Sequence, residues 1–346
     1  MLLENYIPRN VLLTGGAGFI GSNFIRYYLD RENLKIVNLD LLTYAGSLKN
    51  LEKLSSQSDY HFVKGDICDA VLINKILHEH EIDTIVHFAA ESHVDRSIYG
   101  PAPFIQTNVF GTFTLLEAAR RYWLEEKKWD EAQCRFHHVS TDEVFGSLSQ
   151  SDPAFTEKTP YSPNSPYSAS KASSDHLVRA YYHTYHLPIT ISNCSNNYGP
   201  YQHTEKFIPT VIRCCMEGKS IPVYGNGGNV RDWLYVEDHC HAIREILTKA
   251  TVGETYNIGG QTEMDNLSVV DLVCQLMDKV KPKSKPYNSL ITFVHDRPGH
   301  DWRYAMDISK IARELGWQPR EDFVSGLHKT IMFYLSQSVE LSKRPL

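Results

Sequence analysis

The sequence lacks long apolar runs, a strong excess of either charge and any Cys-x-x-Cys pair. Its 346 residues carry 35 Lys and Arg against 41 Asp and Glu, a formal net charge of −6. No apolar stretch approaches the roughly 20 residues of a membrane-spanning helix. The acidic balance does not favour a nucleic acid or an anionic membrane as partner. Residues 1–9 include Glu4 and no apolar core, so they are not typical of a signal peptide.

The cysteines and histidines form no recognisable metal or disulfide pattern. The seven cysteines are irregularly spaced, without a Cys-x-x-Cys, which is typical of reduced thiols in a cytoplasmic protein. His137 and His138 are adjacent on a predicted strand and should face opposite sides. His239 and His241 lie two apart on a predicted helix and should diverge. We therefore expect no metal site and a cytoplasmic location.

Short apolar runs alternate with longer amphipathic segments from residue 10 to about 193. Because parallel strands are buried on both faces, such runs predict the strands of a parallel sheet. Strand–helix alternation predicts an α/β fold with a Rossmann-type doubly wound sheet, whose strands end at one ligand-binding rim. The predicted strands are Asn10–Thr14, Lys35–Leu39, His61–Val63, Thr84–Phe88, Arg135–Val139 and Ile189–Ser192.

The pattern becomes irregular after about residue 195. Residues 225–229 and 282–286 carry loop signals, with shorter strands and helices around them. A chain of this length is also long for one compact core. We predict a sheet domain over residues 1–195 and a smaller C-terminal lobe over residues 196–346 that closes over the rim, with some segments returning to the first domain.

A glycine-rich turn follows the first predicted strand and opens a helix. Gly15, Gly18 and Gly21 allow a tight turn and let a pyrophosphate approach backbone N–H groups at the helix N-terminus. Asp40 ends the next strand, where a carboxylate accepts hydrogen bonds from ribose hydroxyls and repels a 2′-phosphate. Its neighbours Leu41, Leu42 and Thr43 offer no cation for such a phosphate. The sequence therefore predicts bound NAD rather than NADP.

A tyrosine and a lysine are placed for proton abstraction from an alcohol. Tyr167 and Lys171 are four residues apart after Asn164-Ser165-Pro166, a helix start, so they share one helix face. An ammonium and a positive nicotinamide both favour the phenolate over the phenol. Thr141, Asp142 and Glu143 follow a predicted strand at the expected ligand rim. Two neighbouring carboxyls can hold different protonation states, as an elimination of water requires.

These features resemble the extended short-chain dehydrogenase/reductase family, and within it the dTDP-glucose 4,6-dehydratases. The resemblance covers roughly residues 10 to 335, through residues 88–95, 193–200, 231–238 and 296–301. Thr141-Asp142-Glu143 is its most discriminating part, because related epimerases and decarboxylases lack the adjacent acid pair. The resemblance implies a lyase of deoxysugar biosynthesis, such as the dTDP-rhamnose route.

The implied reaction has three steps and no net redox change. Tyr167 takes the proton of the glucose 4-hydroxyl while hydride passes to NAD. Glu143 then removes the C5 proton and Asp142 protonates the departing 6-hydroxyl. Hydride then returns to C6 and a proton returns to C5, which gives dTDP-4-keto-6-deoxyglucose. Thr141 is implied to bond near the sugar 4-hydroxyl.

Further contacts are carried over position by position. Arg231 suits a diphosphate, because its planar fork matches phosphate oxygens. Asp66 is implied near adenine and Asn197 near nicotinamide. The other implied NAD contacts are Phe19, Ile20, Asp40, Leu41, Leu42, Thr43, Ile67, Phe88, Ala89, Ala90, Glu91, Ser92 and Thr107. The implied sugar nucleotide contacts are Ser92, Asn196, Lys206, Phe207, Pro222, Val223, Tyr224, Arg231, Asn266, Asp296, Arg297 and His300.

Three departures from the family pattern stand out. Phe145 replaces a usual tyrosine, Leu41 replaces a usual lysine, and the chain ends at Leu346 without the longer tail of many members. That tail can place an aromatic residue over the base, so thymine against uracil selectivity is left open. The alternatives are a UDP-glucose 4,6-dehydratase, a sugar nucleotide 4-epimerase that needs only Tyr167 and Lys171, and a non-catalytic NAD-binding scaffold or sensor.

Two segments, Thr107–Leu124 and Tyr167–Tyr185, are more broadly apolar than one buried helix face requires. The equivalent helices form a four-helix dimer interface in the family, so a homodimer is implied. Burial within the subunit is the alternative.

Overall fold

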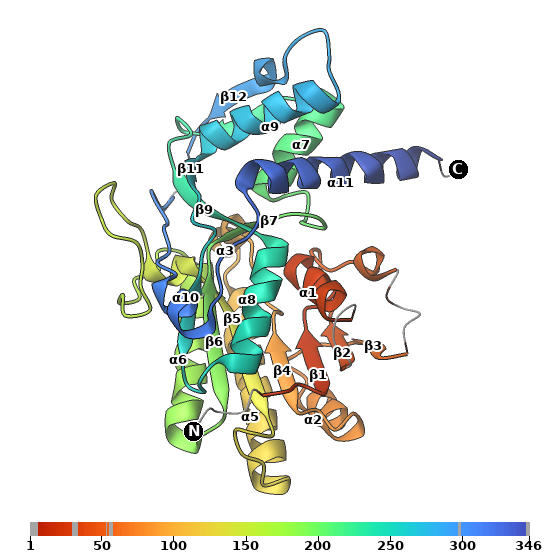
Figure 1. Cartoon of the computed structure of the whole chain (residues 1–346), viewed down its shortest axis with the longest axis vertical. Coiled ribbons are helices and arrows are strands. Elements are labelled where there is room, and N and C mark those ends of the chain that lie inside the picture. Colours follow the sequence, from red (N-terminus) through yellow and green to blue (C-terminus); the bar gives the residue numbers. More distant parts are fainter. Residues whose placement is uncertain (1–5, 30–33, 53, 55–57, 297–298, 344–346) are drawn as a thin grey trace.

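A seven-stranded parallel sheet is the centre of the molecule (Figure 1). The computed structural model describes residues 6–29, 34–52, 54, 58–296 and 299–343. The strand order is β10-β6-β5-β4-β1-β2-β3, so the order reverses between β1 and β4. These strands are β1 (Asn10–Thr14), β2 (Lys35–Asp40), β3 (Tyr60–Lys64), β4 (Thr84–His87), β5 (Arg135–Thr141), β6 (Ile189–Cys194) and β10 (Thr255–Ile258). This is the Rossmann-type sheet that the sequence predicted.

All six predicted strands are confirmed, with differences at their ends. β5 continues two residues beyond its predicted end to Thr141, and β6 continues to Cys194. Both additions are paired in register, Thr141 opposite Cys194. The polar residues of these extensions gave no apolar signal, because pairing rather than hydrophobicity keeps them in the strand.

Helices cover both faces of this sheet. Val11 and Leu13 of β1 pack in one apolar cluster with α1 and α8, whereas Leu12 packs in a second cluster with α2, α5 and α6. This alternation follows from the two-residue period of a strand. The first face carries α1 (Phe19–Leu29), α8 (Val236–Lys249) and α10 (Ser309–Leu315). The second carries α2 (Ala70–Glu79), α5 (Thr112–Ala119) and α6 (Pro166–Tyr185).

Short helical segments complete this part of the molecule. The 3₁₀ turns are η1 (Leu48–Leu51) and η4 (Asp142–Phe145), and α3 (Val94–Tyr99) and α4 (Ala102–Phe104) precede α5. Two π-helical segments, η2 (Ile105–Gly111) and η3 (Arg120–Glu126), flank α5. The helix predicted over Thr107–Leu124 is therefore continuous but locally widened. Among the described residues, no helix has the length and apolar character needed to cross a membrane.

An outer lobe lies beyond the carboxyl ends of the sheet, at the top of Figure 1. Its apolar core is formed by side chains such as Ile212, Trp233 and Val273. Its strands are β7 (Asn196–Tyr198), β8 (Ile221–Tyr224), β9 (Val230–Tyr235), β11 (Glu263–Asp265) and β12 (Ile291–Val294). Its helices are α7 (Phe207–Glu217), α9 (Asn266–Val280), η5 (Tyr287–Leu290) and α11 (Phe323–Lys343). The strands form a three-stranded sheet in the order β11-β9-β7 and a two-stranded sheet of β12 and β8.

The two layers are interleaved along the chain. After β9 the chain returns to the main sheet through α8 and β10, leaves it for β11 and α9, and returns once more through α10. β10 pairs with β6, so residues beyond 195 complete the sheet. The division into residues 1–195 and 196–346 stays a proposal, and α8, β10 and α10 are segments of the second part that pack against the first.

Candidate active site

A cleft lies at the rim where β1, β4, β5 and β6 end. It is lined by residues from the glycine turn, from both sides of the order reversal and from the start of the outer lobe. Of the implied cofactor contacts, those that line it are Gly15, Gly18, Phe19, Ile20, Gly21, Asp40, Leu41, Thr43, Asp66, Ile67, Phe88, Ala89, Ala90, Glu91, Ser92, Thr107, Tyr167, Lys171 and Asn197. Leu42 does not line the cleft: its backbone has a φ of 58° and its side chain packs against the sheet core.

The glycine turn needs its glycines for space as well as conformation. Gly15 has a φ of 76°, and a Cβ there would lie 2.7 Å from the backbone nitrogen of Ala89. A Cβ on Gly21 would lie 2.5 Å from the Gly15 carbonyl oxygen. The absence of these side chains brings the start of α1 against the sheet and leaves a cradle of backbone. This is the arrangement that a dinucleotide pyrophosphate requires.

Asp40 links the glycine turn to the end of β2. Its Oδ2 accepts a hydrogen bond from the Ala17 amide at 2.9 Å, and its Oδ1 accepts one from the Leu42 amide at 2.7 Å. Burial raises the pKa of Asp40, while these two bonds act in the opposite direction. The carboxylate is thus oriented by the backbone before it meets any ligand.

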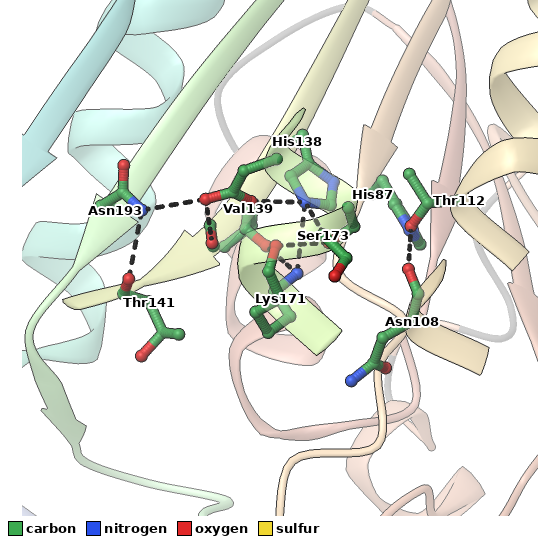
Figure 2. Close-up of polar contacts among 12 residues, drawn as sticks. His87, Asn108, Thr112, His138, Val139, Thr141, Lys171, Ser173 and Asn193 are labelled. Carbon is green, nitrogen blue, oxygen red and sulfur yellow. Dashed lines mark hydrogen bonds and ion pairs between the residues drawn. The ribbon is translucent and has the colours of Figure 1, made fainter. Parts of the chain in front are cut away.

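Tyr167 and Lys171 lie one turn apart at the start of α6 and both line the cleft. The helix begins with a reciprocal cap between Ser165 and Ser168, followed by Pro166, as the sequence predicted. Figure 2 shows the Lys171 ammonium between β5 and α6. Its Nζ donates to the Val139 carbonyl at 2.8 Å and lies 3.3 Å from Nε2 of His138. Burial lowers the pKa of Lys171 to about 8, although Asp175 acts to raise it.

The surroundings of Tyr167 favour its protonated form. Burial raises the pKa of Tyr167 well above its ordinary value, and the Glu143 carboxylate raises it further. A phenolate at this position therefore needs positive charge nearby. Lys171 provides one such charge from the same helix face.

The acid pair consists of two carboxyls in different environments. Asp142 is 2% exposed, and burial followed by the Glu143 charge raises its pKa well above the usual value. Glu143 is only half-buried and lines the same cleft. The Thr141 hydroxyl donates to Asp142 Oδ1 at 3.2 Å and accepts from the Glu143 amide at 3.3 Å. The arrangement can hold one carboxyl protonated beside one ionised carboxylate.

The implied substrate contacts divide between the cleft and the outer lobe. Ser92, Thr141, Asn196 and Lys206 line the cleft, and Lys206 Nζ donates to the Ser92 carbonyl at 2.9 Å. Tyr224 on β8 lies near His300, with ring centroids 6.3 Å apart, and His300 bonds Asp296 at 2.7 Å. The remaining outer positions are Phe207, Pro222, Val223, Arg231 and Asn266. Arg297 lies outside the described residues.

Arg231 connects the outer lobe to the acid pair. Its guanidinium donates to the carbonyls of Val230, Asp301 and Trp302 and stacks over the Tyr304 ring at 4.3 Å. Its charge acts to lower the pKa of Asp142. Arg231 is therefore close enough to influence the acid pair and is already oriented by backbone.

Beneath Lys171 the structure holds a polar cluster that the sequence did not lead us to predict. The Asp175 carboxylate accepts from Ser140 at 2.9 Å and Tyr161 at 2.8 Å, and it lies 3.2 Å from His138. Asp175 follows Lys171 by four residues, as Lys171 follows Tyr167. That repeat was a usable signal, because positions four apart share a helix face.

The two departures within the described residues have different surroundings. The Phe145 ring stacks on Phe155 at 5.1 Å and meets Tyr161 edge-on at 5.2 Å, within an apolar cluster. Leu41 is 44% exposed and lines the cleft. Phe145 is thus a packing residue here, whereas Leu41 faces the predicted cofactor site.

Several known proteins are similar to this chain in sequence and in structure. A family described as GDP-mannose 4,6 dehydratase matches residues 12–330. A dTDP-glucose 4,6-dehydratase of Shigella flexneri is 54% identical, covering 95% of this chain and 93% of the relative. The dTDP-glucose 4,6-dehydratase of Bacillus anthracis, solved in complex with NAD, has a TM-score of 0.85 at 45% identity, covering 96% of this chain and 98% of that one.

A second solved structure gives the same result. DesIV, a dTDP-glucose 4,6-dehydratase of Streptomyces venezuelae solved with NAD and TYD bound, has a TM-score of 0.86 at 44% identity. The match covers 96% of this chain and 98% of DesIV. The glycine turn, the Tyr167–Lys171 pair, the acid pair and these similarities lead to one assignment. The chain belongs to the GDP-mannose 4,6 dehydratase family and, within it, to the dTDP-glucose 4,6-dehydratases of the extended short-chain dehydrogenase/reductases.

Proposed function

We propose that this chain converts dTDP-glucose to dTDP-4-keto-6-deoxyglucose with NAD as its bound cofactor. The observation that carries the proposal is that Asp142 and Glu143 line the same cleft as Tyr167 and Lys171. An epimerase needs only the tyrosine and the lysine. The acid pair adds the groups that loss of water requires, because elimination needs both a base and an acid.

NAD is proposed to lie along the cleft from the glycine turn to Lys171. The cradle left by Gly15 and Gly21 suits its pyrophosphate, and the oriented Asp40 carboxylate suits its adenosine ribose. When bound, NAD supplies the acceptor for hydride from sugar C4 and the donor of that hydride to C6. Asp66, Phe88 and Asn197 are among the residues that would hold it.

Tyr167 is proposed to receive the proton of the sugar 4-hydroxyl at its phenolic oxygen. Its burial makes the phenolate costly, so Lys171 must remain positively charged to stabilise it. Thr141 lies beside Tyr167 in the cleft and offers a hydroxyl for the same part of the sugar. This arrangement couples proton removal at oxygen to oxidation at C4.

Glu143 and Asp142 are proposed to act as base and acid in the elimination. The ketone at C4 acidifies the C5 proton, which the partly exposed Glu143 carboxylate removes. Asp142 is buried and favours its protonated form, so it can donate a proton to the departing 6-hydroxyl. A proton returns to C5 when the hydride returns to C6, which completes the product. The different surroundings of the two side chains thus supply the two protonation states at one pH.

The nucleotide is proposed to extend from the cleft into the outer lobe. Lys206 and Arg231 supply positive charge for the diphosphate, and Arg231 is buried and held by three carbonyls. Tyr224 and His300 then lie on the side expected for the base. The other implied contacts, including Asn196, Phe207, Asn266 and Asp296, would complete this surface.

A substrate panel tests the proposal. Purified protein is incubated with the dTDP, UDP, GDP and CDP forms of glucose, and products are weighed by mass spectrometry and treated with alkali. We expect loss of one water and a 4-keto chromophore with dTDP-glucose. Preference for UDP-glucose would support the UDP-glucose dehydratase alternative, and inversion at C4 with the 6-hydroxyl retained would indicate an epimerase.

We further propose a homodimer formed through η2, α5 and α6. Ile105, Phe110, Phe113 and Tyr185 on these segments are exposed although they are large and apolar. Such a surface is typical of a protein interface. Phe110→Glu should lower the mass measured by sedimentation to that of a monomer, whereas the exposed Val71→Glu on α2 should not.

A cytoplasmic location is likewise proposed. All seven cysteines are free, which fits a reducing compartment. Fractionation of the producing cell would test this, and recovery in an exported fraction would contradict it.

A further inference from the structure

The Lys171 ammonium shares a buried polar cluster with one carboxylate that the proposed chemistry does not use. His138, Lys171 and Asp175 are each at most 4% exposed. Nε2 of His138 lies 3.3 Å from Lys171 Nζ on one side and 3.2 Å from Asp175 Oδ1 on the other. The same ring nitrogen thus lies close to both the ammonium and the carboxylate. Figure 2 shows His138 above Lys171.

Asp175 is fixed by hydrogen bonds from three separate parts of the fold. Oδ2 accepts from Ser140 on β5, from Tyr161 in the loop before α6 and, at 3.3 Å, from Asn193 on β6. Asn193 also donates to the Thr141 carbonyl at 3.1 Å. A carboxylate held in this way cannot turn towards the cleft. It is oriented towards the carboxyl ends of β5 and β6, where Ser140 and Asn193 donate to it.

An ammonium buried this deeply requires a counter-charge, because desolvating it alone is costly. The negative charge of Asp175 acts to keep Lys171 protonated. Other groups face the same cluster: His138 on β5, His87 on β4, Tyr161 in the preceding loop and Arg179 on α6, which bonds Tyr161 at 2.8 Å. Burial lowers the pKa of His138 to about 4, so this imidazole is neutral near pH 7. Asp175 is therefore the carboxylate that balances Lys171.

Asp175 lies closer to Lys171 than to Tyr167, so its negative charge acts mainly on the lysine. Four helical residues span about 6 Å along the axis and eight span about 12 Å, so Asp175 is roughly twice as far from Tyr167 as from Lys171. The carboxylates that act on Tyr167 are Glu143 and Asp142. The charge on Asp175 can therefore hold the ammonium without strongly opposing the phenolate.

We propose that Asp175 is a positioning residue. The electrostatic attraction of its buried negative charge, beside His138, keeps Lys171 protonated next to Tyr167. This inference rests on the proposed function for its kinetic consequence. It assigns no direct contact with substrate to Asp175. It makes Tyr167, Lys171 and Asp175 one electrostatic unit along a single face of α6.

The test removes the charge and keeps the shape. In Asp175→Asn, Lys171 should lose its proton more easily, so the fall in kcat on the alkaline side should begin about one pH unit lower than in the unmodified enzyme. We expect kcat at pH 8 to fall about fivefold, as a displacement of one unit from a pKa of about 8 gives, and KM to change less than twofold. Asp175→Glu restores the charge and should restore the alkaline limb even if its kcat is reduced.

Tyr161→Phe is the matched control, because it removes a hydrogen bond to the same carboxylate without removing charge. Its alkaline limb should stay in place. If Asp175→Asn does not fold, Asp175→Ser offers a smaller neutral replacement. An alkaline limb that is unchanged in a folded neutral variant would overturn the inference.

A second readout needs no substrate. The near-ultraviolet absorbance of phenolate is titrated in each variant, and the matching Tyr167→Phe double variant is subtracted to isolate Tyr167. With NAD added, Asp175→Asn should ionise Tyr167 at higher pH than the unmodified protein does. Identical titrations would also overturn the inference. Failure of the unmodified protein to dehydrate any sugar nucleotide would instead count against the proposed function and leave this titration as the test.

Discussion

The rim of the sheet and the outer lobe both contribute to one site, but different kinds of groups set the geometry in each. At the rim, backbone and fully buried polar groups set the geometry, as in the Gly15 turn and the Lys171–Val139 bond. In the outer lobe, partly exposed side chains such as Tyr224, at the end of β8, and Asp296, just after β12, lie at one two-stranded sheet. We infer that the rim governs the reaction and the lobe governs which nucleotide is accepted. The following predictions test that division.

The largest effect is expected from Tyr167→Phe at the rim. Loss of the phenolic oxygen removes the proton acceptor, and kcat should fall about 10³-fold, within the usual range for acid–base groups. NAD affinity, measured by calorimetry, should change less than threefold. A variant that keeps most of its turnover would place the base elsewhere.

Glu143→Gln should lower turnover by about 10²-fold, because it removes the proposed base for the C5 proton. Incorporation of solvent deuterium at C5, followed by mass spectrometry, should be lost as well. Asp142→Asn is the matched amide control. It should also block loss of water but should retain exchange at C5. Equal exchange in the two variants would refute the separate roles of acid and base.

Gly15→Ala tests how rigid the backbone of the rim is, and the free energy of unfolding is the quantity measured. The added Cβ meets the Ala89 backbone at a positive φ, so unfolding in urea should require about 3 kcal/mol less free energy. Gly316→Ala provides the comparison, since Gly316 has a φ of 70° but a Cβ added there would meet no neighbouring atom within 4 Å. It should cost about 1 kcal/mol. Equal losses would mean that the close approach at Gly15 is easily relieved.

His300→Ala should affect the outer lobe alone. We expect KM for dTDP-glucose to rise about tenfold, the effect of losing one good polar contact, while kcat stays within about threefold. Phe293→Ala on the neighbouring strand is the control, because it is exposed and was not implied as a contact. A loss of kcat without a change in KM would mean that the lobe takes part in the reaction itself.

The smallest effect is expected from Leu41→Lys, which restores the usual family residue at an exposed position of the cleft. The added cation should tighten NAD by about threefold at low salt, and the gain should disappear at high salt. Calorimetric titrations at two ionic strengths would measure this. A gain that does not depend on salt would argue for a packing effect instead.

Much of this architecture could be predicted from local patterns. The six strands, the start of α6 at Pro166 and the shared face of Tyr167 and Lys171 each depend on a few neighbouring residues, and the structure confirms them. The family and the sheet class were also predicted correctly. The roles of the individual site residues remain predictions, because geometry alone shows position and not chemistry.

Other features depend on residues far apart in the chain. The seventh strand was not predicted, since its partner β6 lies more than sixty residues earlier. The role of His138 as a neighbour of Lys171 depends on packing of α6 onto β5, which no period in the sequence encodes. Leu42 was implied as a cofactor contact, but it does not line the cleft, and its half-buried side chain packs against the sheet core.

The late arrival of β10 has a consequence for how this polypeptide is made. Until the ribosome has released the chain up to residue 258, β6 is an edge strand, because the Ile191 amide lacks its hydrogen-bond acceptor, the Glu254 carbonyl. An exposed edge strand can form hydrogen bonds with strands of other chains. A fragment that stops near residue 195 should therefore aggregate rather than fold. During synthesis the sheet is complete only once β10 has been made, and until then a chaperone would be needed to cover β6.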